Sequence, residues 1–209
     1  MKIPDYDWRN AHKEWGRGLR YFQKKLKRAN ITSGKVLDVG CGCGSWVDAA
    51  DRLGCEATGI DIRESRIEIA SIFCSEKTTL MVASTENLPF EDNTFDSVIC
   101  QGVLMFVDAE KTLKEIKRVS KKKSTLLLCW NAMGWSYKLI ADKKVPLNIK
   151  RSAAETIAGI GKVSCYSLDE MIALVSRAGY TELETIPTTA YPRFYQGMQC
   201  VLEGIARSE

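Results

Sequence analysis

The sequence holds few of the residues that build metal sites and no long apolar segment. Among 209 residues there is one histidine, His12, and no pair of cysteines has the C-x-x-C spacing of a structural zinc site. No apolar run approaches the roughly 20 residues that a membrane-spanning helix needs. The first ten residues, MKIPDYDWRN, contain no apolar signal region. We therefore expect no metal, no membrane span and a cytoplasmic protein.

A strong excess of one charge is also lacking. The 30 lysines and arginines stand against 26 acidic residues, and the resulting net charge of +4 is weaker than nucleic-acid-binding proteins usually show. Nucleic acid is therefore not expected as a partner, and the two basic clusters are interpreted as solvated faces or turns. These clusters are Lys24, Lys25, Lys27 and Arg28, and Lys121, Lys122 and Lys123.

The remaining composition is that of an ordinary globular protein. Apolar residues make up 45% of the chain and charged residues 27%, which is enough for a core that requires no disulfide or metal. The eight cysteines are scattered and most lie in apolar runs, so we expect buried, reduced thiols. The length suits a single domain over residues 1–209.

Short apolar runs alternate with helical patterns along the chain. Because continuous apolar strands are covered on both faces, this alternation predicts an α/β fold with a doubly wound, mostly parallel sheet. Two late apolar runs are joined by a loop too short for a crossover helix, which predicts a C-terminal antiparallel hairpin and a seven-stranded sheet. The expected strands are 35–40, 55–61, 78–84, 95–102, 124–130, 180–187 and 199–207, and the expected helices are 45–54, 63–76, 108–119 and 167–179.

Two segments lie outside this alternation. Apolar residues at helical spacing over residues 8–28 predict a helix, and residues 1–30 are interpreted as an N-terminal helical cover. Residues 131–166 contain three glycines, a proline and only partial helical patterns. Since this is too long for a simple connection in a compact domain, the segment is interpreted as a lid or substrate-side insertion.

The stretch VLDVGCGCGSW, residues 36–46, follows the first expected strand and has three interpretations. It would be a metal site built on Cys41 and Cys43, a nucleotide-binding glycine turn, or a strand end with a flexible loop. The turn is favoured because Asp61, at the end of the second expected strand, follows Gly40 by 21 positions. An acidic residue at this separation binds the ribose of an adenosine ligand. Plain capping roles for Asp38 and Asp61 stay open.

A nicotinamide dinucleotide fits this turn poorly. The dinucleotide motif is G-x-G-x-x-G, whereas the glycines here are Gly40, Gly42 and Gly44, and position 45 is serine. Asp38, which precedes the turn, would also repel a pyrophosphate. A nicotinamide-dependent dehydrogenase is therefore the less favoured enzyme class.

At these residues the chain resembles the class I S-adenosylmethionine-dependent methyltransferases. It is most similar to the group that includes the ubiquinone and menaquinone biosynthesis methyltransferases and related small-molecule methyltransferases. The resemblance covers residues 34–186 and is carried by VLDVGCGCG, GID, ASTENLPFEDNTFDSVIC, LKEIKRV and SLDEMIALVSRAGY. It implies a Rossmann-like fold, S-adenosylmethionine as cofactor with S-adenosylhomocysteine as product, and methyl transfer to a small organic acceptor at oxygen or carbon.

The resemblance also implies where the cofactor would lie. Asp38 would position its amino-acid part, the glycine turn would line its methionine and ribose portions, and Asp61 would hold its ribose hydroxyls. Residues after the third and fourth strands would lie near the adenine edge and the methionine portion. The implied cofactor residues are Asp38, Gly40, Cys41, Gly42, Gly44, Asp61, Ile62, Ser84, Thr85, Glu86, Gln101 and Gly102.

The chain departs from the family pattern at three places. Ser84 stands where an acid often binds the adenine amino group, and Met105 and Phe106 stand where a histidine pair often follows the fourth strand. KKKS replaces a PGG sequence and is interpreted as a different surface turn. The first two departures permit a second hypothesis, a cofactor-binding scaffold or regulatory subunit without its own activity. RNA methylation through the basic N-terminal helix is a third.

No catalytic residue is assigned from the sequence. A general base is needed only if the acceptor is a weak acid. The residues that would serve as one are His12, Tyr6, Tyr137, Tyr191 and Tyr195. After the fifth strand, four residues either line an acceptor pocket or pack the insertion, namely Trp130, Asn131, Trp135 and Tyr137.

Overall fold

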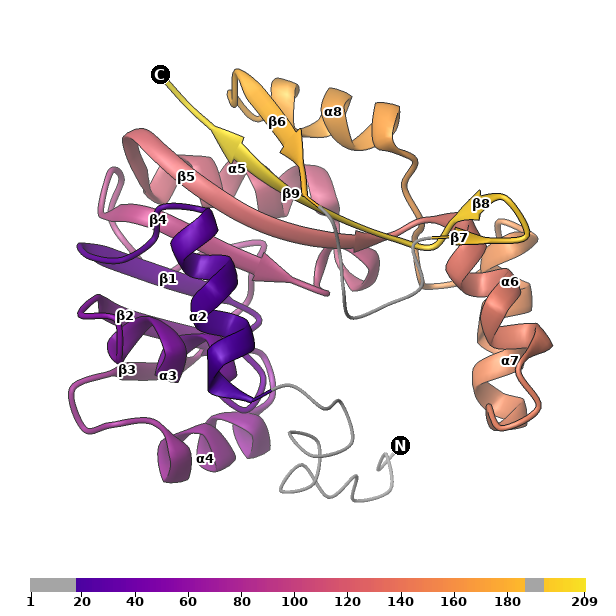
Figure 1. Cartoon of the computed structure of the whole chain (residues 1–209), viewed down its shortest axis with the longest axis horizontal. Helices are drawn as coiled ribbons and strands as arrows, with labels where there is room; N and C mark the ends of the chain where they lie inside the picture. Colours follow the sequence, from indigo (N-terminus) through magenta and orange to yellow (C-terminus); the bar gives the residue numbers. More distant parts are fainter. Residues whose placement is uncertain (1–17, 187–193) are drawn as a thin grey trace.

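A seven-stranded sheet forms the centre of the protein in a computed structural model, which describes residues 18–186 and 194–209. Its strand order is β3-β2-β1-β4-β5-β9-β6 (Figure 1). The strands are β1 (Lys35–Val39), β2 (Glu56–Asp61), β3 (Thr79–Val82), β4 (Phe95–Gln101), β5 (Ser120–Asn131), β6 (Glu182–Thr185) and β9 (Val201–Arg207). The first five are parallel, and β9 lies antiparallel between β5 and β6. The predicted sheet and its C-terminal antiparallel pair are confirmed.

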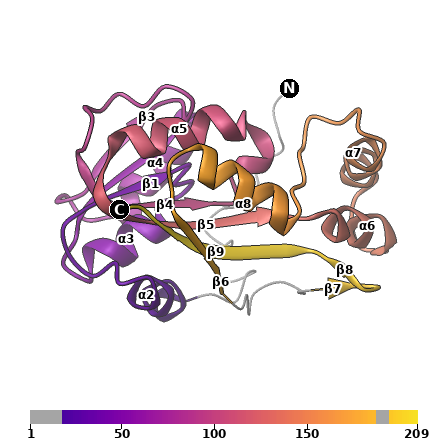
Figure 2. The same ribbon diagram turned by 90° about the horizontal axis from the view of Figure 1, so that it is seen from above.

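Helices cover both faces of this sheet, as Figure 2 shows. One face packs against α2 (Leu19–Arg28) and α3 (Ser45–Asp51), and the other against α5 (Ala109–Val119) and α8 (Leu168–Arg177). The helix α4 (Glu64–Phe73) connects β2 to β3. The sequence predicts α5 and α8 well because capping residues mark where they begin. Asp108 caps α5 through the Lys111 N–H, and Ser167 and Glu170 form the expected capping box of α8.

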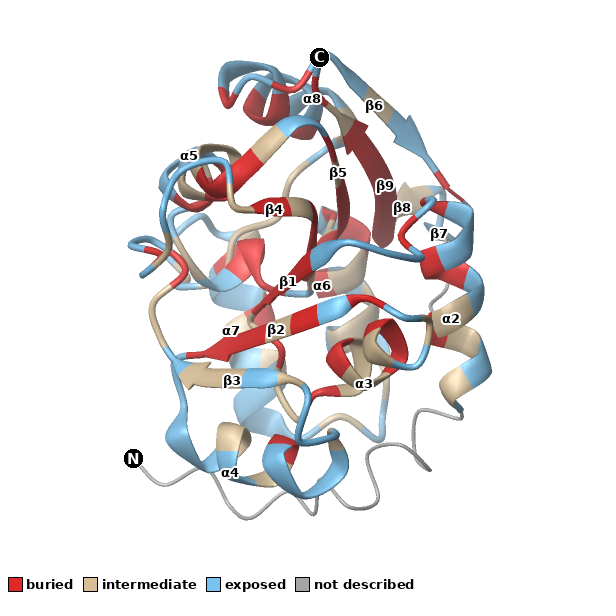
Figure 3. Cartoon of the chain, turned by 90° about the vertical axis from the view of Figure 1, so that its left-hand side faces the viewer, coloured by how far each residue is buried: buried red, intermediate tan, exposed pale blue. Residues whose placement is uncertain are grey.

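The central strands are mostly apolar because both of their faces are buried (Figure 3). Successive side chains point to opposite faces. In β5, Leu126 and Leu128 therefore join the core beneath α5 and α8, while Leu127 joins the core beneath α2 and α3. Two cores with a shared sheet explain why these strands show no polar alternation in the sequence.

The basic clusters are largely solvated, as expected, since Lys24, Lys27, Arg28, Lys122 and Lys123 are exposed, but two details of the interpretation are wrong. Lys25 was expected on a solvated face, but its side chain is buried and forms an ion pair with Glu203 of β9. The lysines at 121–123 were expected in a turn, but they belong to β5, which begins at Ser120. Between its first and later pairs with β4 the register shifts, and Lys123 adopts a positive φ of 58°. The lysine run is thus a bulged strand.

The helix expected over residues 8–28 is confirmed from Leu19 onward, and Gly18 occupies its N-cap position. Residues 1–17 lie outside the described part of the chain, and His12 and Tyr6 lie there with them. Tyr191 lies in the other gap, residues 187–193. The proposed N-terminal cover and these three candidate bases therefore remain predictions.

Residues 131–166 form a helical hairpin and not an irregular loop. Its helices are α6 (Met133–Ala141) and α7 (Leu147–Ile157), which pack side by side beyond the end of β5 (Figures 1 and 2). The base of the hairpin rests on a small ladder of β7 (Phe194–Tyr195) and β8 (Met198–Gln199). A Cβ on Gly134 would lie 2.4 Å from the Gln199 carbonyl oxygen, so only glycine lets α6 approach β8 this closely.

No helix in the described part of the chain is long and apolar enough to cross a membrane. Among the same residues, no three histidine, cysteine, aspartate or glutamate side chains are grouped so that they could hold a metal ion.

Candidate cofactor site

The predicted site residues meet at the carboxyl ends of β1, β2 and β4. These strands are neighbours in the sheet, with β1 in the middle. The chain leaves β1 to build β2 and β3 on one side, and then crosses back to build β4 on the other. Ligands of open α/β sheets bind at such a reversal of strand order. Asp38, Asp61 and Gln101 are each at or next to the last residue of their strands.

The three glycines of the turn after β1 have different roles. All three have positive φ, which favours glycine. A Cβ on Gly40 would lie 2.4 Å from Val103 Cγ2, and one on Gly44 would lie 2.5 Å from Cys74 Sγ, so these two glycines serve the packing of the protein itself. A Cβ on Gly42 would meet no heavy atom within 4 Å. Gly42 is therefore the glycine of this turn that faces open space.

Gly102, directly after β4, shares both properties of Gly42. Its φ is +71°, and a Cβ there would also meet nothing within 4 Å. The backbone at these two positions can thus be approached by a ligand without steric hindrance from the protein.

Asp38 is a buried carboxyl group with one oxygen that has no hydrogen-bond partner among the described residues. Its side chain lies within β1 and is 2% exposed, and its Oδ2 atom accepts no hydrogen bond within the described residues. Burial raises the pKa of Asp38 well above its usual value, and the nearby Asp61 carboxylate raises it further. Gln101 Nε2, at the end of β4, is likewise buried without an acceptor in the described structure. Such orphaned polar atoms indicate a ligand with complementary groups.

Asp61 is the second buried carboxylate, and it organises the turn. Its Oδ2 atom accepts the Gly42 N–H at 3.1 Å and pairs with Arg66 Nη1 at 3.2 Å, while its Oδ1 atom accepts the Arg63 N–H at 2.9 Å. The N-cap of α4 is Arg63, so Asp61 is not itself the helix cap. Asp61 instead ties the glycine turn to the start of α4.

Arg66 is the site residue that sequence reasoning missed. It lies in the first turn of α4 and reaches back to the Asp61 carboxylate. The signal was present in the sequence as a basic residue five positions after Asp61, which a helix beginning at residue 64 turns toward the strand end.

Ile62 continues the site as an exposed apolar surface. Its side chain is 70% exposed, although the neighbouring Asp61 is buried. Val82, at the end of the adjacent strand β3, is also exposed. A planar apolar group of a ligand can cover these side chains, and removing their apolar surface from water would favour binding.

Four predicted cofactor residues have side chains that contact other parts of the protein. Thr85 Oγ1 lies 3.2 Å from Thr112 Oγ1 of α5, and Glu86 Oε1 accepts the Asp108 N–H at 3.0 Å. Ser84 Oγ accepts the Glu86 N–H. Cys41 packs into the core, where its Sγ atom would lie 3.0 Å from a Cβ on Gly59. The polar side chains of Ser84, Thr85 and Glu86 are therefore already hydrogen-bonded within the protein.

The aromatic residues at the end of β5 and beyond it mostly serve packing. Trp130 is fully buried and its Nε1–H donates to the Tyr166 carbonyl at 3.1 Å. Trp135 and Tyr195 pack against the buried cluster of Cys129, Cys200 and Val201. Tyr137 is exposed on α6. Of the two interpretations offered for this group, packing of the insertion is therefore confirmed for Trp130 and Trp135.

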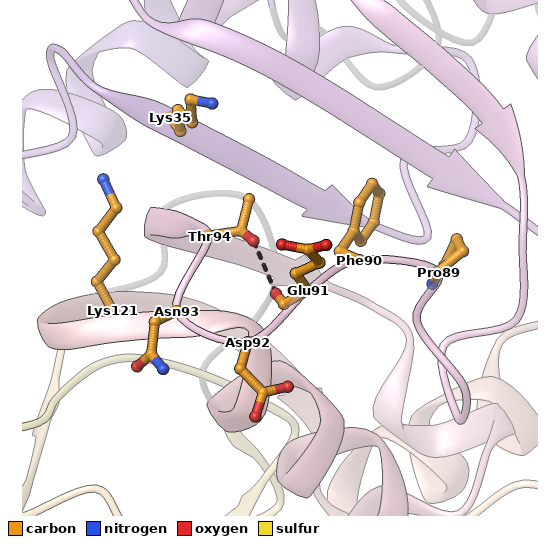
Figure 4. Close-up of a pocket in the computed structure, with 8 residues that line it drawn as sticks. All are labelled: Lys35, Pro89, Phe90, Glu91, Asp92, Asn93, Thr94 and Lys121. Atoms are coloured by element: carbon orange, nitrogen blue, oxygen red, sulfur yellow. Dashed lines mark hydrogen bonds between the residues drawn. The ribbon is translucent and has the colours of Figure 1, made fainter.

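The motif ENLPFEDNTFD contributes to a separate pocket at the opposite edge of the sheet (Figure 4). This cavity has a volume of about 560 Å³ and lies near the start of β1, β4 and β5. The Lys121 ammonium donates to Asp96, and the Lys35 ammonium pairs with Glu56 at 3.6 Å, so the lysines offer little free charge. The lining residues are Lys35, Pro89, Phe90, Glu91, Asp92, Asn93, Thr94 and Lys121.

Comparison with known proteins connects this geometry to one family. The family model described as "Methyltransferase domain" matches residues 37–128, which run from within β1 to within β5. The uncharacterized methyltransferase YcgJ of Bacillus subtilis is 34% identical over 99 residues, which are 45% of this chain and 39% of that protein. A demethylmenaquinone methyltransferase of Geobacillus sp. is 34% identical over 125 residues, 56% of this chain and 53% of its own. The chain thus spans about half the length of these relatives, or less.

The fold is also that of solved methyltransferases. The phosphoethanolamine N-methyltransferase 2 of Haemonchus contortus, determined in complex with S-adenosyl-L-methionine, superposes with a TM-score of 0.70 at 17% identity. The match covers 91% of this chain and 53% of that one. Residues 37–128 are therefore similar to the methyltransferase-domain family, and the chain has the Rossmann-like fold of solved S-adenosylmethionine-dependent methyltransferases.

Proposed function

We propose that the chain binds S-adenosylmethionine at the ends of β1, β2 and β4 and transfers its methyl group to a small organic acceptor. The observation that supports this most is the pair of buried carboxylates, Asp38 and Asp61, flanking a Gly42 that faces open space. The cofactor has two ribose hydroxyls and an amino-acid end that carries an ammonium group. These groups are complementary to two carboxylates that lie on adjacent strands.

Each part of the site has a partner on such a ligand. Asp61 would accept from the ribose hydroxyls once Arg66 moves from its Oδ2 atom. Asp38 and Gln101 would meet the amino-acid portion with the polar atoms that now have no partner among the described residues. Ile62 would cover one face of the adenine, and Gly42 and Gly102 would let the ligand approach the backbone.

The cofactor supplies a methyl group on a sulfonium leaving group, so the protein needs to align the acceptor with that carbon. Phe106 and Met133 are exposed apolar residues that follow β4 and β5 at the same edge of the sheet. We place the acceptor against them, which favours an apolar or planar molecule over a highly charged one. The relative named as a demethylmenaquinone methyltransferase supports an acceptor of this kind.

Two measurements test the function. Titration calorimetry with S-adenosylhomocysteine should give saturable, one-to-one binding. Incubation with methyl-labelled S-adenosylmethionine and a panel of demethylated quinols, sterols and phosphoethanolamine should then transfer label to one class. Absence of binding at millimolar ligand would refute the proposal. Binding without transfer to any acceptor, together with a co-purifying protein, would favour the scaffold hypothesis instead.

The Asp38 carboxylate is expected to lower the stability of the fold and to contribute to ligand binding. Because the pKa of Asp38 is raised in the folded state, the charged form destabilises the fold as the pH rises through that pKa. Asp38→Asn should therefore raise the melting temperature of the ligand-free protein near neutral pH by about 2–4 °C, which corresponds to roughly 1 kcal/mol at this size. It should weaken S-adenosylhomocysteine binding about tenfold, by the loss of a charged hydrogen bond.

The pH dependence provides the control for this variant. The difference in melting temperature between wild type and Asp38→Asn should shrink in acid, where the Asp38 carboxyl is protonated and the wild type carries no buried charge there. A constant difference across pH 4–8 would show that the charge is not the cause.

The glycines of the turn allow a matched comparison. Gly42→Ala should lower the free energy of unfolding by about 1 kcal/mol, because residue 42 has a positive φ of 55°. It should also weaken S-adenosylhomocysteine binding, because the new methyl group enters the space proposed for the ligand. Gly40→Ala has a similar φ but also overlaps Val103, so it should lose a further 1–3 kcal/mol of stability. Urea unfolding and calorimetry separate the two effects. Wild-type binding by Gly42→Ala would contradict the assignment.

A further inference from the structure

The hairpin of residues 131–166 has its small residues inside and its large apolar residues outside. The residues that α6 and α7 bury are Gly134 and Ser136 in α6 and Ala153 and Thr156 in α7. Six of the 13 exposed large hydrophobic residues of the described chain belong to this segment, among them Leu147 at 75% and Ile160 at 78% exposure. The other four are Met133, Tyr137, Ile140 and Ile149.

The outward faces of the two helices continue this pattern along their length. In α6, Met133, Tyr137 and Ile140 recur at helical spacing, and all three are exposed. In α7 an exposed row runs from Leu147 through Arg151 to alanines at 154 and 158. A water-facing helix normally shows the opposite distribution, so the outer surface of the hairpin is suited to an apolar environment.

Residues 131–166 have the same net charge as the entire chain. Six basic residues stand against two acidic ones between positions 131 and 166, a balance of +4, which equals the net charge of the entire chain. None of the six forms an ion pair within the described residues. The basic residues are Lys138, Lys143, Lys144, Lys150, Arg151 and Lys162, and the acidic ones are Asp142 and Glu155.

The position of the hairpin connects it to the candidate site. Because α6 follows directly from β5, the hairpin stands at the edge of the sheet where Asp38 and Asp61 lie (Figure 1). Its base is held firmly by the contact of Gly134 with the backbone of β8 and by a hydrogen-bond contact of Ser136 with Cys165. A surface that binds the outside of the hairpin would therefore lie beside the approach to the site.

We propose that the α6–α7 hairpin docks on an anionic lipid surface, with Leu147 and its apolar neighbours entering the headgroup region and the lysines contacting lipid phosphates. Exposed aliphatic residues among unpaired lysines and arginines are the combination that interfacial helices use. A nucleic acid would use the charge but would leave Leu147, Ile149 and Ile160 in water. A second copy of the hairpin would bring like charges together. The proposal does not depend on methyl transfer, because it is tested without cofactor or acceptor.

Vesicle co-sedimentation of the whole chain tests the proposal. We expect binding to vesicles of phosphatidylglycerol and phosphatidylcholine in equal parts, and weak or no binding to phosphatidylcholine alone. Binding should fall as the salt concentration rises from 0.1 M to 1 M, since the screening length shortens from about 10 Å to about 3 Å. Absence of binding to the anionic vesicles at low salt would overturn the proposal.

Two variants, each with a matched control, locate the surface. Lys143→Glu with Lys144→Glu should lower the vesicle partition coefficient about 25-fold, since each basic residue near the surface contributes roughly fivefold. Lys122→Glu with Lys123→Glu makes the same charge change at the opposite edge of the sheet and should alter binding less than about twofold by this argument. Leu147→Glu should lower binding about tenfold or more. Ile72→Glu replaces an equally exposed residue on α4 and should leave binding unchanged.

Three other outcomes would also overturn the proposal. Equal losses in the control variants would show attraction by net charge alone. Hairpin-dependent binding to a single-stranded RNA oligonucleotide without vesicle binding would assign the surface to nucleic acid. A dimer that Leu147→Glu dissociates, again without vesicle binding, would assign it to a second copy. All substituted residues are exposed, and unchanged melting temperatures would confirm that each variant folds.

Discussion

Asp61→Ala is expected to weaken S-adenosylhomocysteine binding by roughly 100-fold or more. Under the proposed function the Asp61 carboxylate accepts both ribose hydroxyls, and each hydrogen bond to a charged group contributes about 1.5–3 kcal/mol. The same carboxylate accepts the Gly42 N–H, so its loss also releases the turn that the ligand contacts. Titration calorimetry with the purified variant measures the effect directly.

Arg66→Met is the control that separates the ribose contact from the ion pair. It retains the Asp61 carboxylate and its bonds to the Gly42 and Arg63 N–H groups, and removes only the guanidinium at 3.2 Å. Because the ribose would have to displace this guanidinium, Arg66→Met should bind S-adenosylhomocysteine at least as tightly as wild type. A loss equal to that of Asp61→Ala would show that the Asp61–Arg66 pair, and not the ribose contact, maintains the site.

The sequence predicts the sheet and the acidic pair because both leave local signals. Strands covered on both faces are continuous apolar runs, and β1, β4 and β5 are such runs. Asp38 and Asp61 are predicted to lie together because the carboxyl ends of neighbouring parallel strands share one edge. The register of β1 with β2 confirms this, since Asp38 stands opposite Gly59, two residues before Asp61.

The sequence does not predict which glycines of the turn pack against the protein and which one faces open space. Gly40, Gly42 and Gly44 are identical in the sequence and alike in φ. Only the positions of Val103 and Cys74, 63 and 30 residues further along the chain, distinguish packing glycines from the one that faces open space. For the same reason the sequence does not predict that the side chains of Thr85 and Glu86, which the resemblance implies lie near the adenine, bond to Thr112 and to the Asp108 N–H.

Lys25 shows most clearly what local patterns miss. It stands in a run of basic residues, which predicts a solvated face, and its partner Glu203 is 178 positions away. Yet Lys25 is 7% and Glu203 3% exposed, and the Lys25 ammonium also lies 5.1 Å from the centre of the Tyr21 ring. The pair joins α2 to β9, so the first described helix and the last strand are held together by two buried charges.

Lys25→Met is therefore expected to destabilise the protein by about 3–5 kcal/mol, because it removes a counter-charge from the buried Glu203 carboxylate. At this chain length such a loss lowers the melting temperature by roughly 6–20 °C. Lys24→Met is the matched control: the neighbouring lysine is exposed, and its replacement should change the free energy of unfolding by no more than about 0.5 kcal/mol. Urea unfolding of both variants measures the difference.

The double variant Lys25→Met with Glu203→Leu separates the charge from the packing. Replacing a buried ion pair with apolar residues of similar size is often neutral or stabilising, because neither charge then has to leave water. The double variant should thus recover most of the stability that Lys25→Met loses, a coupling of about 2–4 kcal/mol between the two positions. If the two substitutions were simply additive, Lys25 would hold α2 through its hydrocarbon chain and the Tyr21 ring, and the ion pair would contribute little.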